Sequence, residues 1–152
     1  IEEIQLYSLI LDALGVIELH DREIDLVVDK KVNIEGDRDL ILRVFTNLLS
    51  NISRYTPKEC KVKIQIHEKE ETAYFEVSDS GRGVPEEFLP KIFDSFVREE
   101  ESRSKVTGGL GLGLMLVKQI IERHSGEITV QNKPTGGLSI EWTLPLTQPK
   151  KQ

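Results

Sequence analysis

The sequence predicts an α+β sandwich, in which helices cover one face of a mixed β-sheet. Apolar residues recur at three- and four-residue spacing in three segments, which is typical of amphipathic helices. In the segments between them apolar and polar residues alternate, which is typical of strands. The predicted order is helix, strands, helix, paired strands, loop, helix and paired strands, and this order favours separate helical and sheet layers.

Length and composition indicate a single globular domain over residues 1–152. The chain has 152 residues, close to the usual size of about 150 residues per domain. Hydrophobic residues make up 38%, enough for a packed core and too many for a disordered chain. The 20 basic and 26 acidic residues give a net charge of −6, which argues against nucleic acid as a partner. The only cysteine, Cys60, excludes an internal disulfide and a cysteine-cluster zinc site, and suits a reducing compartment.

No segment of the sequence is predicted to insert into a membrane. The most apolar stretch, residues 110–121, is interrupted by Lys118 and Gln119 and is shorter than the roughly 20 residues that a span needs. The acidic start of the chain lacks the basic region and cleavage site of a signal peptide. We therefore expect a cytoplasmic domain cut from a longer protein. Whether that protein is a membrane-tethered receptor stays open.

The first third of the chain is predicted to contain one helix and two or three short strands. Apolar residues at helical spacing from Ile4 onward indicate an amphipathic helix that ends at Gly15. Apolar and polar residues then alternate between residues 16 and 37, which indicates strands separated by charged turns.

A second helix is expected from residue 37 onward. Asp37 stands where an N-cap would, and the helix should stop before Pro57, because a residue that precedes proline disfavours the helical conformation. A continuous apolar stripe along this helix consists of Leu40, Ile41, Val44, Phe45, Leu48, Leu49 and Ile52.

The middle of the chain is predicted to form a β-hairpin. Residues 61–67 and 72–78 alternate between apolar and polar, and the charged run 68–71 between them forms the turn. A glycine-bearing turn at residues 79–85 and a short segment at residues 86–96 follow the hairpin.

The last third is expected to begin with a loop and a third helix. Residues 97–107 are polar and predict a loop, and helical spacing resumes through Leu114 and Val117. Gly126 stands just past the end of this helix, as a C-terminal stop would. The remaining expected elements are strands at 127–131 and 138–144, the turn 133–137 between them and a frayed tail at 145–152.

The second helix carries the first group of candidate site residues. Asn47 and Asn51 are four residues apart and therefore share a face, which Arg54 and Tyr55 extend. A neutral amide oxygen suits a magnesium ion whose charge is already balanced by phosphates. The alternative is an ordinary solvated helix face.

The turn after the hairpin carries the second group. Asp79 stands at a strand end, and Gly81 and Gly83 allow the backbone to approach a flat ligand closely. A carboxylate accepts hydrogen bonds only, so it could pair with an exocyclic amine such as that of adenine. A surface turn that merely needs two positive φ angles is the alternative.

The third group is a glycine-rich run before the third helix. Glycines at positions 108, 109, 111 and 113 allow successive backbone N–H groups to point outward, and a helix N-terminus attracts anions, so phosphate is the natural ligand. The run lacks the Gly-Lys-Ser/Thr of a P-loop and the preceding strand of a dinucleotide-binding motif.

Taken together, these segments resemble one family. NLLSN followed by RYTP resembles the N box, DSGRG the G1 box, IFDSF the F box and GLGLGL the G2 box of the catalytic, ATP-binding domain of sensor histidine kinases. Their order and spacing match that family from about Asp37 to Leu144. The resemblance implies the Bergerat-type α/β sandwich that gyrase, Hsp90 and MutL ATPases share.

The resemblance also implies roles for individual residues. Asn51 corresponds to the magnesium ligand, and Asp79 corresponds to the adenine-recognising aspartate in a pocket shaped by Gly81 and Gly83. Phe93 and Phe96 correspond to aromatic residues that pack beneath the ATP lid, here residues 97–107. The expected nucleotide and phosphate contacts are Arg54, Tyr55, Arg98, Gly109, Leu110, Gly111, Leu112, Gly113 and Leu114. Lys105 and Arg103 are added as candidates on charge alone.

Three positions depart from what related proteins have. Ile52 replaces a common alanine, and Leu110 replaces a common threonine whose hydroxyl is one possible phosphate contact. Autonomous ATPases of this fold usually have a water-activating glutamate at the position of Asn47. Because an amide cannot act as a general base, the sequence disfavours ATP hydrolysis and favours transfer to another acceptor, with Asn47, Arg54 and Arg98 as the catalytic candidates.

The expected function is therefore that of a histidine kinase catalytic domain. It binds Mg-ATP and transfers the γ-phosphate to a histidine on the kinase's own dimerisation domain, N-terminal to this chain, from which a response-regulator aspartate receives it. None of His20, His67 and His124 is expected to be the acceptor, and His124 suits a helix C-terminus as a partial positive charge. The alternatives are a serine kinase of the anti-sigma-factor type and an interaction module that binds no nucleotide.

Overall fold

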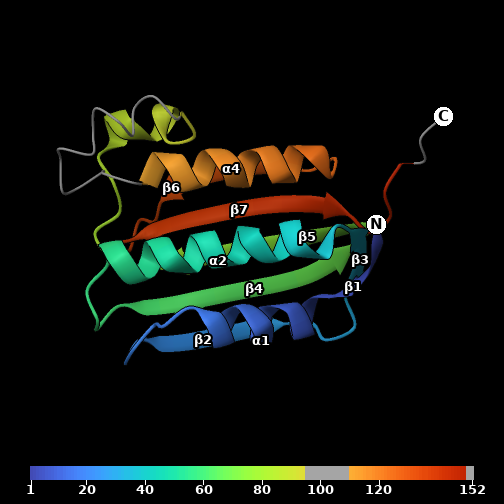
Figure 1. The fold of residues 1–152 in the computed structure, drawn as a ribbon. Helices are drawn as coiled ribbons and strands as arrows, with labels where there is room; N and C mark the ends of the chain where they lie inside the picture. The colour runs from blue at the N-terminus through green and yellow to red at the C-terminus, as the bar shows by residue number, and fades with distance from the viewer. Residues whose placement is uncertain (95–109, 150–152) are drawn as a thin grey trace.

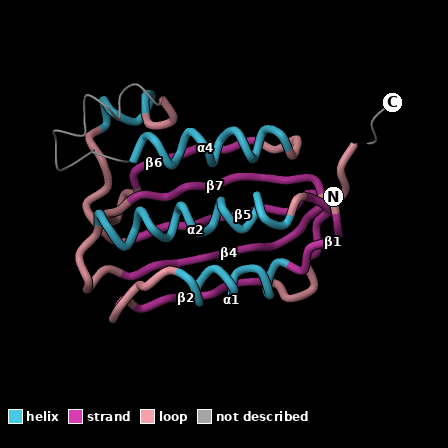
Figure 2. The backbone as a smooth tube through the Cα atoms, in the orientation of Figure 1, coloured by secondary structure: helices cyan, strands magenta, loops and turns pink. Residues whose placement is uncertain are grey.

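The computed structural model describes residues 1–94 and 110–149 (Figure 1). A five-stranded sheet has the order β2-β4-β5-β7-β6, in which β2 and β4 are parallel and the other neighbours antiparallel. Figure 2 shows α1, α2 and α4 in one layer on one face of this sheet. The predicted α+β sandwich with a mixed sheet is thus confirmed. The sheet strands are β2 (Glu23–Val28), β4 (Lys61–Lys69), β5 (Thr72–Asp79), β6 (Glu127–Asn132) and β7 (Leu138–Pro145).

The first predicted helix starts later than expected, because a strand precedes it. β1 (Glu2–Gln5) pairs with β3 (Asn33–Gly36), and this pairing places Ile4 opposite Ile34 in the core. The helix α1 (Leu6–Val16) begins only where the Gln5 side chain accepts a hydrogen bond of 2.9 Å from the Ser8 amide. Ile4 is the only buried side chain of β1, so this strand shows no alternating pattern, and Ile4 happens to fit the spacing of the helix that follows.

The second helix, α2 (Arg38–Tyr55), matches its prediction at both ends. Asp37 caps it by accepting a hydrogen bond of 3.2 Å from the Leu40 amide, and it ends before Pro57. Its apolar stripe packs on the sheet, where Phe45 lies 5.4 Å from Trp142 between ring centroids. Trp142 in turn stacks on Phe75 at 5.0 Å. The core between α2 and the sheet is therefore aromatic at its centre.

The predicted hairpin is present as β4 and β5, with a tighter turn than expected. β4 runs through Lys69, so only two residues connect the strands. These residues, Glu70 and Glu71, have φ angles of 50° and 69°, which is the backbone twist that two-residue hairpin loops require. The segment after the G1 turn forms a short 3₁₀ helix, η1 (Glu86–Lys91).

The C-terminal end of α4 (Leu110–Arg123) differs from the prediction in two respects. Ser125, with φ 66°, takes the left-handed position after the helix that was expected of Gly126. Gly126 is needed for another reason, since a Cβ there would lie 2.1 Å from the Thr143 carbonyl oxygen of β7.

His124 does not act as a positive charge at the helix end. Its Nε2 accepts a hydrogen bond of 3.0 Å from the Asp37 amide, and its Nδ1 lies 2.8 Å from the Ile120 carbonyl oxygen. A neutral ring with its proton on Nδ1 satisfies both contacts. The buried imidazole therefore joins the end of α4 to the start of α2.

The tail was expected to fray from Pro145, and it is bound as far as Gln148. The Leu146 amide donates to the Glu71 carbonyl oxygen at 2.9 Å, and the Gln148 side chain donates to the His124 carbonyl oxygen at 2.8 Å. These bonds tie the tail to the β4–β5 turn and to the end of α4. None of the helices in the described ranges combines the length and the apolar character that crossing a membrane requires.

The two alanine substitutions at Gly126 and Gly15 should have opposite effects on stability. Gly126→Ala should lower the free energy of unfolding by about 2 kcal/mol or more, because its Cβ would overlap the β7 backbone. Gly15→Ala, at an exposed position in α1 with nothing within 4 Å of the added Cβ, should raise it by about 0.5–1 kcal/mol. Urea denaturation of both variants measures this. Equal effects would show that the approach of Gly126 to β7 is not required.

Candidate functional site

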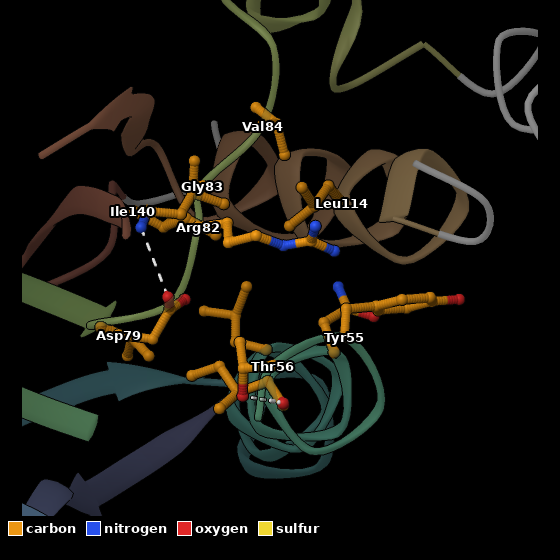
Figure 3. Close-up of a pocket in the computed structure, with 13 residues that line it drawn as sticks. Tyr55, Thr56, Asp79, Arg82, Gly83, Val84, Leu114 and Ile140 are labelled. Atoms are coloured by element: carbon orange, nitrogen blue, oxygen red, sulfur yellow. Dashed lines mark hydrogen bonds between the residues drawn. The ribbon is translucent and has the colours of Figure 1, made fainter. Parts of the chain in front are cut away.

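A pocket lies where the C-terminal half of α2, the end of β5 and the start of α4 meet (Figure 3). The space between its walls amounts to about 690 Å³, part of it open to solvent. Most of its wall is apolar, with a few polar groups among the apolar side chains. The apolar residues that line it are Leu48, Ile52, Val77, Val84, Leu114, Leu138 and Ile140.

Asp79 is the acidic residue among those that line the pocket. It ends β5 and is only 7% exposed. Its Oδ1 accepts hydrogen bonds from the Gly81 amide at 2.8 Å and the Leu138 amide at 3.4 Å. Within the described residues Oδ2 has no hydrogen-bond partner. The carboxylate is thus held firmly by one oxygen, and the other can accept a bond from a ligand.

Burial raises the pKa of Asp79 above its usual value. The loss of hydration has the largest effect, and it is opposed by the two amide hydrogen bonds and by the positive charge of Lys133. The folded protein therefore bears a cost for keeping this carboxylate ionised in the pocket. A buried carboxylate with a perturbed pKa in a cleft is typical of a functional site.

Two residues that the sequence analysis did not single out hold the turn after Asp79. Asn132 accepts a hydrogen bond of 2.9 Å from the Val84 amide and donates one of 2.7 Å to the Val84 carbonyl oxygen. Gly137 packs so closely that a Cβ there would lie 1.9 Å from the Asp79 carbonyl oxygen. Only the paired glycines of the turn before β7 hinted at this close approach in the sequence. Gly83, with φ 73°, keeps the positive φ expected of it and lines the pocket.

The predicted polar face of α2 is only partly at the pocket. Asn51 and Tyr55 line it, and Asn51 Nδ2 is buried without a hydrogen-bond partner among the described residues. Asn47, one turn earlier, is half-buried and Arg54 is exposed, and neither is among the lining residues. Thr56, which the sequence analysis missed, lines the pocket beside them.

The site fits a magnesium ion only with a phosphate ligand. Within residues 1–94 and 110–149 no group of three His, Cys, Asp or Glu side chains could hold a metal. Asn51 lines the pocket, and its side-chain amide carries one neutral oxygen of the kind that magnesium accepts. Magnesium accepts such a set, because it usually keeps several waters and takes its remaining ligands from substrate phosphates.

The glycine-rich box forms the first turn of α4, whereas the sequence analysis placed it before the helix. The backbone from Leu110 to Gly113 is helical, and Leu114 then lines the pocket. Because the first N–H groups of a helix have no partner within it, this turn presents donors and a positive dipole end to an anion. Gly109, Phe96, Arg98, Arg103 and Lys105 lie outside the described residues, as does the expected lid at 97–107.

Phe93 and Arg82 are two further side chains near α4. Phe93 is half-buried against the core, and Lys118 of α4 places its Nζ 5.3 Å from the centre of that ring. Arg82, which the sequence analysis did not select, lines the pocket and extends its guanidinium toward Tyr55 and Leu114 (Figure 3). The pocket therefore has a cation on the side of α4 and a carboxylate at the end of β5.

The chain is similar to known proteins over most of its length. Residues 36–148 match the family described as histidine kinase-, DNA gyrase B-, and HSP90-like ATPase. Sensor histidine kinase WalK of Bacillus subtilis (strain 168) is 34% identical over 148 residues, which is 95% of this chain and 24% of that protein. The signal transduction histidine-protein kinase BaeS of Escherichia coli (strain K12) is 39% identical over 115 residues, 76% of this chain and 25% of that protein. The chain thus spans about a quarter of these relatives.

The fold is similar to solved histidine kinase domains. The catalytic domain of histidine kinase ThkA superposes with a TM-score of 0.82 at 28% identity, covering 95% of this chain and 97% of that one. ThkA has also been solved in complex with the response regulator protein TrrA, and that kinase chain gives a TM-score of 0.79 at 27% identity, covering 98% of this chain and 42% of that one.

Because Asp79 is buried, we expect the free energy of unfolding to depend on its ionisation and therefore on pH. Because the folded-state pKa is raised, Asp79 stabilises the fold only when protonated, and this contribution is lost as pH rises above 3.8, the value without burial. Asp79→Asn removes the buried charge and should be more stable than the parent chain at pH 7, with the difference shrinking toward about pH 4. Urea denaturation across this range measures it.

Asp25→Asn serves as the control, because Asp25 is an exposed aspartate on β2 away from the pocket. Its stability should stay close to that of the parent chain under the conditions in which Asp79→Asn differs from it. A loss of stability in Asp79→Asn at pH 7 would mean that the bonds to the Gly81 and Leu138 amides outweigh the cost of burial.

Proposed function

Because the chain belongs to the histidine kinase-, DNA gyrase B- and HSP90-like ATPase family, we propose that it is the catalytic, ATP-binding domain of a sensor histidine kinase. The observation that carries this proposal is the pocket lined by Asp79, Asn51 and Leu114, the residue that follows the first turn of α4. The three come from segments far apart in the sequence, and each matches one chemical part of Mg-ATP. WalK, BaeS and ThkA, which the chain resembles, are all histidine kinases.

The adenine ring would bind at the end of β5. Asp79 Oδ2 would accept a hydrogen bond from the exocyclic amine, and apolar side chains that line the pocket, such as Ile52 and Ile140, would contact the ring. Guanine carries a carbonyl oxygen where adenine carries the amine, so the carboxylate would repel it. The pocket therefore favours ATP over GTP.

The phosphates would lie between α2 and the first turn of α4. The N–H groups around Gly111 and Gly113, the Arg82 guanidinium and the Asn51 amide border this side. Magnesium, when bound, neutralises phosphate charge and aligns the γ-phosphate for in-line transfer. Asn51 would hold it. We include Arg54, Tyr55, Arg98, Lys105, Gly109, Leu110, Leu112 and Leu114 as further nucleotide contacts, and Phe93 and Phe96 as supports for a lid at 97–107.

The reaction that suits this site is transfer rather than hydrolysis. Asn47 stands where a water-activating glutamate would be needed, and an amide cannot take a proton from water. A histidine nitrogen on the dimerisation domain would attack the γ-phosphorus, the bond to the β,γ-bridging oxygen would break and ADP would leave. The phosphate would then pass to an aspartate of a response regulator. The complex of ThkA with TrrA supports that partner.

Replacing Asn51 should remove most of the effect of magnesium on nucleotide binding. Asn51→Ala deletes the proposed amide ligand, so the ratio of the ATP dissociation constant without magnesium to that with magnesium should fall by about tenfold or more. Isothermal titration with a non-hydrolysable ATP analogue, in magnesium and in chelator, measures this ratio. Asn33→Ala, at an exposed asparagine of β3 away from the pocket, is the control. An unchanged ratio in Asn51→Ala would exclude Asn51 as the ligand.

The full-length kinase should transfer the γ-phosphate of ATP to a histidine, and the product should be labile to acid and stable to base. Asp79→Asn should bind ATP about 30-fold more weakly, a loss of about 2 kcal/mol for one buried hydrogen bond, and should lose the label at low ATP concentration. Labelling with γ-³²P-ATP, followed by acid and base treatment, tests both. An acid-stable phosphate would identify a serine kinase instead, and a chain that binds no nucleotide would be an interaction module.

A further inference from the structure

A buried arginine that the proposed mechanism does not use lies next to the pocket. Arg22, in the segment between α1 and β2, is only 6% exposed, and no carboxylate of the described residues forms an ion pair with it. Its guanidinium donates four hydrogen bonds instead. The acceptors are the carbonyl oxygens of Leu19 (3.0 Å), Ser53 (3.2 Å) and Thr56 (2.7 Å) and the hydroxyl oxygen of Thr56 (3.2 Å).

Three of these acceptors belong to the C-terminal end of α2. The last carbonyl groups of a helix have no partner within it, and a cation near them is favoured by the helix dipole. Arg22 supplies donors to the Ser53 and Thr56 carbonyl oxygens, while Ser53 Oγ donates to the Glu18 carbonyl oxygen at 2.9 Å. The segment from residue 18 to residue 22 therefore fixes how α2 ends.

Thr56 connects this end of α2 to the carboxylate of the pocket. Its hydroxyl accepts from Arg22 Nε and donates to the Ile52 carbonyl oxygen at 2.5 Å, so its orientation is fixed. A Cβ built on Gly81 would lie 3.1 Å from the Thr56 methyl group and 3.0 Å from Asp79 Oδ1. Thr56 thus packs against the turn that holds Asp79, and Figure 3 shows both side chains on the same side of the pocket.

We propose that Arg22 is a positioning residue of the nucleotide site, which acts through Thr56 on the turn that holds Asp79. The proposal rests on the proposed function of the pocket. Without the guanidinium, the part-buried Ser53 and Thr56 carbonyl groups lose their donors, and the hydrogen bond from Ser53 Oγ to Glu18 is what still joins the last turn of α2 to residues 18–22. The Thr56 methyl group then no longer supports the Gly81 turn, and nucleotide affinity falls in a chain that remains folded.

The geometry requires an arginine more than a positive charge. The guanidinium is a rigid fork whose separate nitrogens reach acceptors on two sides, here Leu19 and the end of α2. A lysine presents all its donors from one atom, so it can reach the Ser53 and Thr56 carbonyl oxygens only at the expense of the other acceptors. Arg22→Lys should therefore restore part of the function that Arg22→Met loses.

The test compares Arg22→Met, Arg22→Lys and Arg38→Met. Arg38 is a matched control, because its guanidinium pairs with Asp12 at the opposite end of the same helix. Isothermal titration of each folded variant with Mg-AMPPNP should give a dissociation constant raised about tenfold for Arg22→Met, an intermediate value for Arg22→Lys and a change below about twofold for Arg38→Met. Circular dichroism verifies that each variant is folded at the temperature of titration.

A second variant tests the path through Thr56. Thr56→Val keeps the shape of the side chain and removes the hydroxyl that Arg22 holds, so it should weaken binding alone and add little to Arg22→Met in the double variant. Additive losses would contradict the path. The amide NMR signals of Thr56 and Gly81 in the nucleotide-free chain should shift in Arg22→Met. If Arg22→Met is too unstable to titrate with nucleotide, these shifts still test the coupling, and Arg22→Lys replaces Arg22→Met in the titration.

The outcomes separate this proposal from the proposed function. If Arg22→Met is less stable and yet binds Mg-AMPPNP as tightly as the parent chain, Arg22 is structural only and the proposal is wrong. If the parent chain binds no nucleotide, the proposed function is wrong, and an unchanged Gly81 signal in Arg22→Met would overturn the coupling independently.

Discussion

The position of α2 is the constraint on which the rest of the pocket depends, and this helix is fixed at both ends by side chains from other parts of the chain. At its start the Asp37 amide donates to the buried His124 ring at the end of α4. At its end Arg22 takes up carbonyl groups that the helix leaves without partners. Between these ends Phe45 packs on the aromatic core of the sheet. Because hydrogen bonds hold both ends of the helix, they also fix where the side chains of its last two turns lie at the pocket wall.

The end of β5 combines a stability cost with the proposed binding role of Asp79. Burial disfavours the ionised form of Asp79, and the amides of Gly81 and Leu138 offset only part of that cost. The turn after it would not hold this geometry alone. Asn132 of β6 forms two hydrogen bonds with the Val84 backbone. Gly137, just before β7, has no side chain, so the turn between β6 and β7 can pack directly on the Asp79 backbone. The sheet thus positions a carboxylate whose ionised form is disfavoured by burial, which is the expected compromise between stability and the proposed function.

Errors in the sequence analysis share a common origin in contacts between distant residues. Ile4 fits the spacing of a helix, but pairing with Ile34 makes it part of a strand. Gly126 fits a helix stop, but Ser125 is the residue that takes the left-handed conformation. Position 126 needs glycine for another reason, since a side chain there would overlap the backbone of β7. His124 fits a charged helix end, but a backbone N–H 87 positions earlier in the chain makes it a hydrogen-bond acceptor. Local periodicity contains none of this information.

The sequence by itself determined the helices and strands that depend on neighbouring residues, and the kinds of side chain that the site contains. The N-cap at Asp37, the apolar stripe of α2 and the alternation of the hairpin depend on residues within one or two turns or strands, so periodicity is sufficient to predict them. Only the tertiary structure decided which side chains meet. It brought Asn51 and Asp79 to one pocket and left Asn47 and Arg54 outside its lining, and it placed Arg22 beneath the end of α2. The reason is physical: a hydrogen bond across more than thirty residues leaves no periodic trace, because chain topology and not spacing brings its partners together.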